Sequence, residues 1–117
     1  MKKILITGCA GFIGFHLSKI LSIKYKIIGI DSLEKNKISK IANDRINILK
    51  KNKNFSFKKT KIDNFKKLEI IFKKNKFFAV INLAATPGVR ASFLNPNIYF
   101  KNNILGFYNI YLLSIKN

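Results

Sequence analysis

Hydrophobic and polar positions follow a strand, helix, strand order along the first part of the chain. The apolar run 4–6 ends in Thr7 and Gly8, as is typical of a buried strand. From Phe12, apolar residues recur at helical spacing, and the apolar run 27–30 then predicts a second buried strand that closes at Asp31. In the helix we expect Ile13, Leu17, Ile20 and Leu21 to face the core, and Ser18, Lys19, Ser22 and Lys24 to face solvent.

The middle of the chain repeats this alternation. Segments 36–51 and 64–74 carry apolar residues at helical intervals, and Asn64 is expected to cap the second helix. Segments 55–57 and 77–81 predict short strands. The inward positions expected in the two helices are Ile38, Ile41, Ala42, Ile46 and Leu49, then Phe65, Leu68, Ile71 and Phe72.

The last segment predicts a strongly apolar helix. After a loop through Pro87, Gly88 and Pro96, segment 98–115 is apolar on most faces, and we expect it to be buried on more than one side. Strands that alternate with helices indicate a parallel sheet with right-handed crossovers. The prediction is therefore one doubly wound α/β domain over 1–117, with about four strands and a following helix.

Composition supports a folded domain but raises the question of a polyanionic partner. The chain has 117 residues and 48% hydrophobic residues, which suits a single core. It carries 23 Lys and Arg against 5 Asp and Glu, a net charge of +18. Only Arg45 and Arg90 are arginines, whereas base readout favours the guanidinium fork. The abundant Lys, Ile, Asn, Phe and Tyr share adenine- and thymine-rich codons, so we expect no nucleic-acid partner and interpret the lysine clusters as solvated surface.

Other broad classes are disfavoured as well. Cys9 is the only cysteine and His16 the only histidine, so we expect no disulfide and no metal site. The start of the chain resembles a charged secretory start, but glycines interrupt its apolar run and no small-residue cleavage site follows. No stretch approaches the ~18 apolar residues of a spanning helix. We therefore expect a cytoplasmic protein with no membrane partner.

Segment 7–14, between the first strand and the first helix, carries three glycines. Gly8 permits a tight turn, Gly11 lets backbone approach a pyrophosphate, and Gly14 lets the helix pack closely on the strand. The start of the helix offers unpaired N–H groups and about half a positive charge to phosphates. This turn predicts a dinucleotide site.

Charged residues after the second strand bear on which dinucleotide binds. Asp31 can accept hydrogen bonds from an adenosine ribose and would repel a 2′-phosphate, which favours NAD over NADP. Lys35 and Lys37 leave NADP open as an alternative.

The glycine spacing resembles that of the extended short-chain dehydrogenase/reductase superfamily, and the resemblance continues along the chain. Ile62-Asp63 is similar to the segment whose aspartate meets the adenine amino group. Segment 82–85 is similar to the Asn/His-Leu-Ala-Ala stretch beside the cofactor, and Asn103 with Gly106 is similar to the family's Asn-x-x-Gly. The resemblance implies a Rossmann-type NAD-binding domain. The implied cofactor-binding residues are Gly8, Gly11, Phe12, Ile13, Gly14, Asp31, Ile62, Asp63, Leu83, Ala84, Ala85 and Asn103.

Segment 87–96 resembles a stretch of UDP-glucuronate 4-epimerases and related sugar-nucleotide epimerases. By this resemblance Arg90 and Ser92 bind the substrate, since a guanidinium suits phosphate or carboxylate. Alternatively, Arg90 pins its own loop. The departures from the family's stretch are Thr86, Pro87 and Ala91.

The superfamily's catalytic groups are a Ser or Thr and a Tyr-x-x-x-Lys pair, in which lysine lowers the pKa of the tyrosine. The residues four positions after Tyr25, Tyr99, Tyr108 and Tyr111 are Gly29, Asn103, Leu112 and Ile115. We therefore expect no catalytic residue in this chain and interpret it as the N-terminal part of a longer enzyme, inactive by itself.

The resemblance implies that the longer enzyme is a 4-epimerase of a UDP-sugar. NAD would act as a recycled hydride carrier through a 4-keto sugar, and the full-length protein is expected to be a homodimer. A nucleotide-sugar dehydratase or reductase shares the same motifs and remains an alternative. A stand-alone dinucleotide-binding or interaction module is the other.

Overall fold

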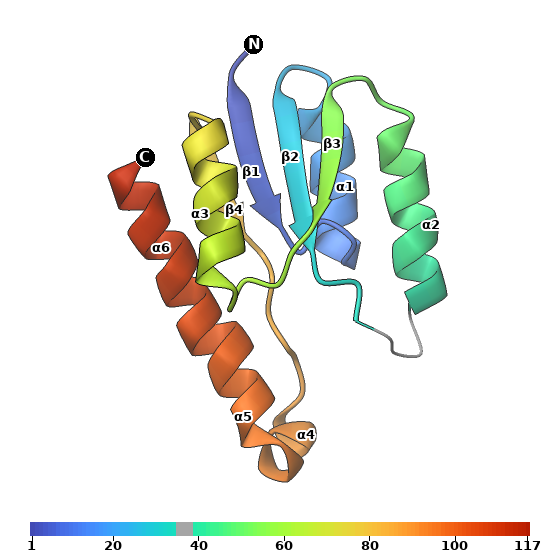
Figure 1. Cartoon of the computed structure of the whole chain (residues 1–117). Helices are drawn as coiled ribbons and strands as arrows, with labels where there is room; N and C mark the ends of the chain where they lie inside the picture. Colours follow the sequence, from blue (N-terminus) through green and yellow to red (C-terminus); the bar gives the residue numbers. More distant parts are fainter. Residues whose placement is uncertain (35–38) are drawn as a thin grey trace.

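A four-stranded parallel sheet forms the centre of the molecule (Figure 1). The computed structural model describes residues 1–34 and 39–117. The strands are β1 (Lys3–Thr7), β2 (Lys26–Asp31), β3 (Phe55–Lys59) and β4 (Ala79–Asn82), in the order β3-β2-β1-β4. The helices are α1 (Phe12–Leu21), α2 (Ser39–Lys50), α3 (Phe65–Lys74), α4 (Val89–Leu94), α5 (Pro96–Tyr99), the π-helix η1 (Phe100–Leu105) and α6 (Gly106–Lys116). Every strand pair is parallel, so the predicted doubly wound α/β class is confirmed.

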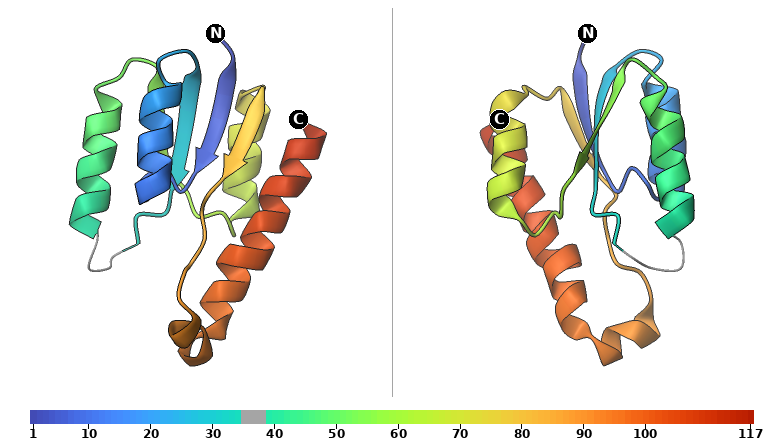
Figure 2. Two further views of the ribbon diagram at one scale, coloured as in Figure 1. Left: turned by 180° about the vertical axis from the view of Figure 1, so that it is seen from behind. Right: turned by 45° about the vertical axis from the view of Figure 1, so that its right-hand side comes forward.

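Helices cover both faces of the sheet (Figures 1 and 2). α1 and α2 lie on one face, and α3 and α6 lie on the other. Successive side chains of a strand point to opposite faces, so Ile4 and Ile6 pack toward α1 and α2 whereas Leu5 packs toward α3 and α6. Because both faces are buried, the central strands β1 and β2 carry near-continuous apolar runs rather than alternating residues. The remaining buried core residues are Cys9, Ala10, Ile27, Ile46, Leu49 and Phe55 on the first side, and Ile28, Ile30, Ile62, Leu68, Ile71, Phe72, Ile110 and Leu113 on the second.

The face of α1 that packs on the sheet is not the one predicted from hydrophobic spacing. Ser18 and Ser22 are fully buried, whereas Ile13 and Ile20 are 66% and 64% exposed. Gly14 accounts for this, because a Cβ there would lie 2.1 Å from the carbonyl oxygen of the first glycine of the turn. With the helix backbone this close, small side chains occupy the same stripe at four-residue spacing. The positions predicted correctly are Leu17, Leu21, Lys19 and Lys24.

The C-terminal segment differs from the prediction in two respects. The expected loop after β4 contains the short helix α4. The expected burial of segment 98–115 on more than one side is wrong for the described structure, in which Phe100, Phe107 and Tyr111 are each more than half exposed. This helix contacts α3 on one side and runs past the carboxyl end of the sheet (Figure 1), so its outer face meets solvent. Its buried residues are Gly106, Asn109, Ile110 and Leu113.

The two middle helices largely follow the prediction. The Asn64 side chain accepts a hydrogen bond from the Lys67 N–H at 3.1 Å, so the predicted cap of α3 is confirmed. In α2, Ile46 and Leu49 are buried as expected, whereas Ile41 is 49% exposed. The predicted start of this helix, including Ile38, lies outside the described residues. The other correct positions are Ala42, Phe65, Leu68, Ile71 and Phe72.

The two edge strands, β3 and β4, differ from their predicted bounds by one or two residues. β4 begins at Ala79 rather than at residue 77, and Phe77, before the strand, packs edge-on against Phe72 with ring centroids 5.2 Å apart. β3 continues past residue 57, and its Lys58 and Lys59 pair with the end of β2. The strand is therefore longer than its apolar pattern, since the exposed lysines give no period-two signal.

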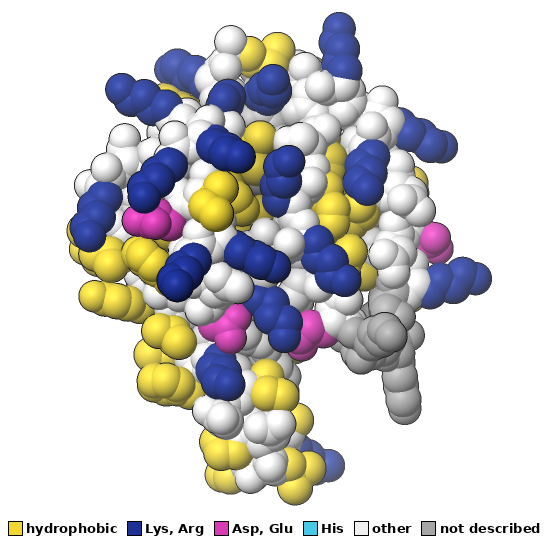
Figure 3. Space-filling model, in the orientation of Figure 1, with side chains coloured by type: hydrophobic (Ala, Val, Ile, Leu, Met, Phe, Trp, Pro, Cys, Tyr) yellow, Lys and Arg dark blue, Asp and Glu magenta, His cyan; other side chains and the backbone are white. Residues whose placement is uncertain are grey.

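The lysine clusters lie on the surface, as predicted. Figure 3 shows Lys and Arg side chains spread over the face that is drawn there. The exposed members are Lys50, Lys51, Lys53, Lys58, Lys59, Lys61, Lys73, Lys74 and Lys76. Within residues 1–34 and 39–117, no helix combines the length and apolar character needed to cross a membrane.

Candidate functional site

A cavity of about 500 Å³ opens at the carboxyl ends of the strands. Segments that follow all four strands line it, together with parts of α1, α2 and η1. The chain leaves β1 toward β2 on one side and reaches β4 on the other, and ligands of open α/β sheets bind at such a switch point. The lining residues are Gly8, Ala10, Gly11, Phe12, Ile30, Asp31, Ser32, Leu33, Glu34, Ile41, Ala42, Arg45, Thr60, Lys61, Ile62, Leu83, Ala84, Ala85, Thr86, Pro87 and Asn102.

The glycine turn forms the floor of this cavity. Gly8 has a φ of 69°, a left-handed conformation that favours glycine. A Cβ on it would lie 2.9 Å from the Ala84 nitrogen, so the segment after β4 runs directly against the turn. α1 begins at Phe12 after the exposed N-cap Gly11, and no side chain caps its first turn. Its N–H groups and the positive end of the helix dipole are therefore available to an anion.

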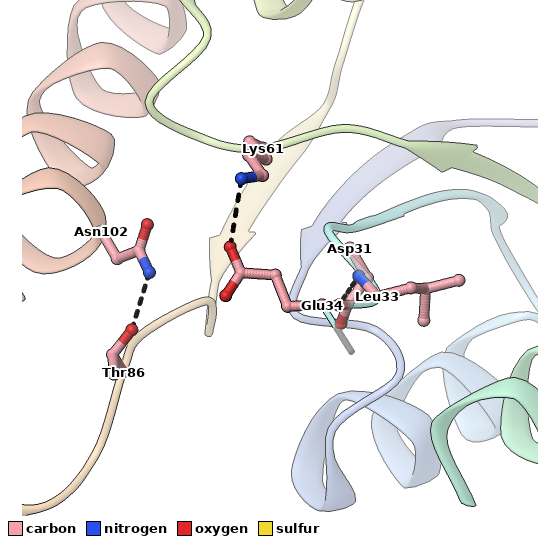
Figure 4. A network of polar contacts seen from close by, with 6 residues as sticks. All are labelled: Asp31, Leu33, Glu34, Lys61, Thr86 and Asn102. Carbon is pink, nitrogen blue, oxygen red and sulfur yellow. Dashed lines mark hydrogen bonds and ion pairs between the residues drawn. The ribbon is translucent and has the colours of Figure 1, made fainter. Parts of the chain in front are cut away.

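Asp31 links β2 to the turn. Its Oδ2 accepts a hydrogen bond from the Ala10 N–H at 3.0 Å. Its Oδ1 accepts one from the Leu33 N–H at 3.0 Å (Figure 4). Leu33 has a φ of 50°, which is unusual for a leucine and turns the chain along the cavity. Each carboxylate oxygen has a second lone pair, so Asp31 can still accept hydrogen bonds from a ligand.

Thr7, at the end of β1, holds the segment that follows β4. Its buried hydroxyl oxygen accepts hydrogen bonds from the Leu83 and Ala84 N–H groups, both at 3.0 Å, and the hydroxyl donates to the side-chain oxygen of Asn82. One hydroxyl therefore satisfies three groups where the chain enters the cavity wall.

The valine substitution Thr7→Val is expected to lower the free energy of unfolding by about 1 to 3 kcal/mol, because it leaves these three groups without their partner. Thr7→Ser keeps the hydroxyl and is the matched control, with a loss expected below about 1 kcal/mol. Urea unfolding of both variants measures the difference. Equal stability of the two would show that the hydroxyl does not hold this segment.

Side chains of η1 and α6 form hydrogen bonds with two residues that line the cavity, Thr86 and Ile62. The Asn103 side chain accepts from the Thr86 N–H at 2.8 Å and donates to the Thr86 carbonyl at 3.0 Å. Asn102 donates to the Thr86 hydroxyl at 2.7 Å (Figure 4). Further along, the buried Asn109 donates to the Ile62 carbonyl at 3.0 Å, and Gly106 leaves room for the Ile62 side chain, which a Cβ would approach to 2.5 Å. The π-helical turn brings the consecutive Asn102 and Asn103 to the same residue, Thr86, and π-helical turns are frequent at functional sites.

Charged side chains flank the Asp31 end of the cavity. Lys61 Nζ lies 3.4 Å from Glu34 Oε1, which joins the segments after β3 and β2 (Figure 4). Both side chains are well exposed, so the pair adds little stability. On the α2 side, Arg45 donates from Nη1 to the Ala10 carbonyl at 3.1 Å.

The structure brings together part of the predicted site. The predicted residues that line the cavity are Gly8, Gly11, Phe12, Asp31, Ile62, Leu83, Ala84 and Ala85. Gly14 lies beneath the turn, Ile13 points to solvent, and Asn103 holds Thr86 from behind. Asp63 is half-buried next to Ile62 and does not line the cavity.

The two predicted substrate residues lie apart from the cavity. Arg90 and Ser92 belong to α4, beyond the carboxyl end of the sheet (Figure 1), and Arg90 is exposed. The Ser92 hydroxyl donates to the Val89 carbonyl within that helix. Within the described residues, neither side chain contributes to the cavity wall.

Sequence reasoning missed several residues that form the site. Thr7 and Arg45 each left a signal: a threonine at the end of a buried strand and an arginine among lysines. Asn102 and Thr86 left none, because their pairing depends on the π-helical turn.

Cys9 lies within the turn but is fully buried, and burial raises the pKa of its thiol, with the nearby Asp31 carboxylate raising it further. The thiolate is the reactive form. We therefore expect no reaction of native Cys9 with a thiol reagent at neutral pH, and complete reaction in guanidinium chloride. With a reagent that releases a chromophore when it reacts with a thiol, the absorbance measures the extent of reaction of the native and of the unfolded chain. Rapid labelling of the native chain would show that the turn opens.

A family model and two curated proteins that match this chain are all named for enzymes that act on nucleotide sugars. A model described as GDP-mannose 4,6 dehydratase matches residues 5–116. The chain is 42% identical over 107 residues to the UDP-glucuronate 4-epimerase of Thermodesulfobacterium geofontis, covering 91% of this chain and 33% of that protein. It is 44% identical over 109 residues to the dTDP-D-glucose 4,6-dehydratase of Dictyostelium discoideum, covering 91% of this chain and 24% of that protein.

A solved structure shows the same arrangement of elements. The UDP-glucuronic acid 4-epimerase of Bacillus cereus, in complex with UDP-glucuronic acid and NAD, superposes with a TM-score of 0.84 at 33% identity, over 95% of this chain and 35% of that one. The chain thus spans about a third of the length of the relatives it matches. The resemblance inferred from the motifs is confirmed, and with the family model matched over nearly its whole length the chain belongs to the GDP-mannose 4,6 dehydratase family.

Proposed function

We propose that this chain binds NAD and serves as the cofactor-binding part of a nucleotide-sugar 4-epimerase. The observation that carries the proposal is that the uncapped start of α1 and the Asp31 carboxylate line one cavity. A helix start suits a pyrophosphate, and a carboxylate at the end of the second strand suits the hydroxyls of an adenosine ribose. The residues present fit the group, because no side chain caps the start of α1, and the exposed Gly11 leaves its first N–H groups open to the cavity.

The proposal assigns roles by position. Gly8, Gly11, Phe12, Ile13 and Gly14 form the turn and helix start that hold the pyrophosphate. Asp31 binds the ribose, Ile62 borders the adenine, and Leu83, Ala84 and Ala85 run beside the rest of the cofactor. Asp63, which does not line the cavity, is assigned to the adenine by its match to the family motif alone. Asn103 acts through Thr86, whose backbone it holds on both sides. NAD supplies a group that takes up a hydride and returns it.

NAD binding by the purified chain tests this proposal. Isothermal titration calorimetry of the unsubstituted chain is expected to show one site. Gly11→Val should abolish binding while leaving the fold intact, since Gly11 is exposed, its φ is −69°, and its Cβ would meet only the Gly8 oxygen at 3.2 Å. Equal affinity of the valine variant would place the site elsewhere.

An epimerase acting on a UDP-sugar is the preferred enzyme class. Two of the similar proteins, that of Thermodesulfobacterium geofontis and that of Bacillus cereus, are named as 4-epimerases of UDP-glucuronate. The segment with Arg90 and Ser92 supports the same class, because the Arg90 guanidinium suits an anionic sugar nucleotide. A dehydratase is the second candidate, because the dTDP-D-glucose 4,6-dehydratase shares 44% identity. Incubation of the chain with NAD and UDP-glucuronate is expected to give no epimer, since the sequence has no Tyr-x-x-x-Lys pair. Product would contradict this assignment of roles.

We also infer that the full-length protein is a homodimer. The outer face of η1 and α6 presents exposed apolar side chains, among them Ile104, Phe107 and Tyr111, and the Phe107 and Tyr111 rings stack at 6.3 Å. Patches of this kind mark interaction surfaces. Sedimentation velocity over a range of concentrations is expected to show association that Tyr111→Lys reduces.

A further inference from the structure

Arg45 occupies an unusual place in a lysine-rich chain. Of 23 basic residues only two are arginines, and this one is half-buried on α2. Its Nη1 donates to the Ala10 carbonyl at 3.1 Å, and the residue lines the cavity. A guanidinium offers five donors in a fixed plane, whereas a lysine ammonium is a flexible point charge. The geometry of the contact, rather than charge alone, accounts for an arginine here.

Arg45 completes a clamp around Ala10. The N–H of Ala10 donates to Asp31 Oδ2 at 3.0 Å, and its carbonyl accepts from Arg45. The Ala10 side chain is 2% exposed, so the residue is fixed by its methyl group as well. Ala10 precedes Gly11, the N-cap of α1. The direction of the first N–H groups of α1 therefore depends on a residue that β2 holds from one side and α2 from the other.

Two aromatic rings hold Arg45 in place. Its guanidinium carbon lies 5.8 Å from the Phe12 ring centroid and 6.0 Å from that of Phe15, within the range of cation–π attraction. Both rings belong to the first turns of α1, which lies beside α2 on the same face of the sheet (Figure 2). The arginine is thus braced against the same helix whose start it orients.

We propose that Arg45 is a positioning residue for the anion-binding turn. By pairing with the Ala10 carbonyl, it fixes the turn so that the helix start presents N–H groups, and not an unpartnered oxygen, to the pyrophosphate. This inference rests on the proposed binding of NAD. It predicts that loss of Arg45 weakens the binding of ligands that carry a pyrophosphate more than the binding of ligands that lack one, although Arg45 itself contacts the backbone.

Calorimetric titration of the full chain with NAD, ADP and AMP tests the inference. Arg45→Met is expected to weaken NAD and ADP roughly tenfold, the effect of losing one charge-assisted hydrogen bond, and AMP much less. Arg45→Lys should restore part of the loss, because an ammonium can still donate to the carbonyl. Lys40→Met removes the same charge from an exposed position of α2 and should leave all three affinities unchanged.

Several outcomes would overturn the inference. Arg45→Met and Lys40→Met with equal NAD affinity would remove any role beyond net charge. Equal weakening of ADP and AMP would indicate a structural role that does not depend on the pyrophosphate. If Arg45→Met does not fold, the same comparison is made with Arg45→Lys, whose ADP affinity must then fall more than its AMP affinity. An unsubstituted chain that binds no NAD would overturn the proposed function and this inference together.

Discussion

Gly14→Ala is expected to lower the free energy of unfolding by about 4 kcal/mol or more, enough to unfold a chain of ordinary stability. The added Cβ would lie 2.1 Å from the Gly8 oxygen, 2.8 Å from the Gly8 carbonyl carbon and 2.9 Å from the Cys9 Cα. All three are backbone atoms of a turn that Ala10 and Asp31 hold in place. Because no flexible side chain can move aside, α1 itself has to shift away from the sheet.

Gly11→Ala provides the matched control for this prediction. It makes the same chemical change three residues earlier, where the Cβ would meet one backbone oxygen at 3.2 Å and the residue is exposed. Its effect on stability is expected to stay below about 1 kcal/mol. Urea unfolding followed by circular dichroism compares the two. If the free energy of unfolding of Gly14→Ala is no lower than that of Gly11→Ala, the close approach of helix and turn is not required.

The same close approach shows what hydrophobic spacing predicts and what it misses. Strand and helix order followed from the sequence because continuous apolar runs and helical spacing report burial on both faces of a sheet. The face of α1 that packs on the sheet could not be predicted in this way, because Gly14 brings the helix backbone itself, and not apolar side chains, into contact with the turn. Ser18 and Ser22 are buried for their small size, and no count of apolar residues detects that.

The site divides along similar lines. Gly8 and Asp31 were recognisable because turn chemistry and a position at the end of a strand are local signals, and the structure places both at the cavity. The contacts of Thr7 with Leu83 and Ala84, and of Asn103 with Thr86, join residues far apart in the sequence. Such pairs depend on strand order and on the π-helical turn, neither of which has a local signature.

Asp31→Ala is expected to weaken NAD binding roughly 30-fold or more and to narrow the preference for NAD over NADP by about tenfold. The carboxylate has three tasks that this change removes together, the first of which is to accept hydrogen bonds from the adenosine ribose. It also fixes the turn through the Ala10 and Leu33 N–H groups, and it places a negative charge where a 2′-phosphate would have to sit. NADP loses the fixed turn but gains from removal of the charge, so its affinity should fall less than that of NAD. Titration with both dinucleotides gives the ratio.

Glu34→Gln is the control that separates charge from position. It removes one negative charge from the same end of the cavity, at a side chain that pairs with the exposed Lys61 and makes no contact with the turn in the described structure. Because this carboxylate is solvated and already paired, its effect on the NAD to NADP ratio should be under about threefold. If Glu34→Gln shifts the ratio as much as Asp31→Ala, general electrostatics and not Asp31 sets the preference. Tighter binding of NADP than of NAD by the unsubstituted chain would contradict the assignment of Asp31 itself, and would direct attention to Lys35 and Lys37, which lie outside the described residues.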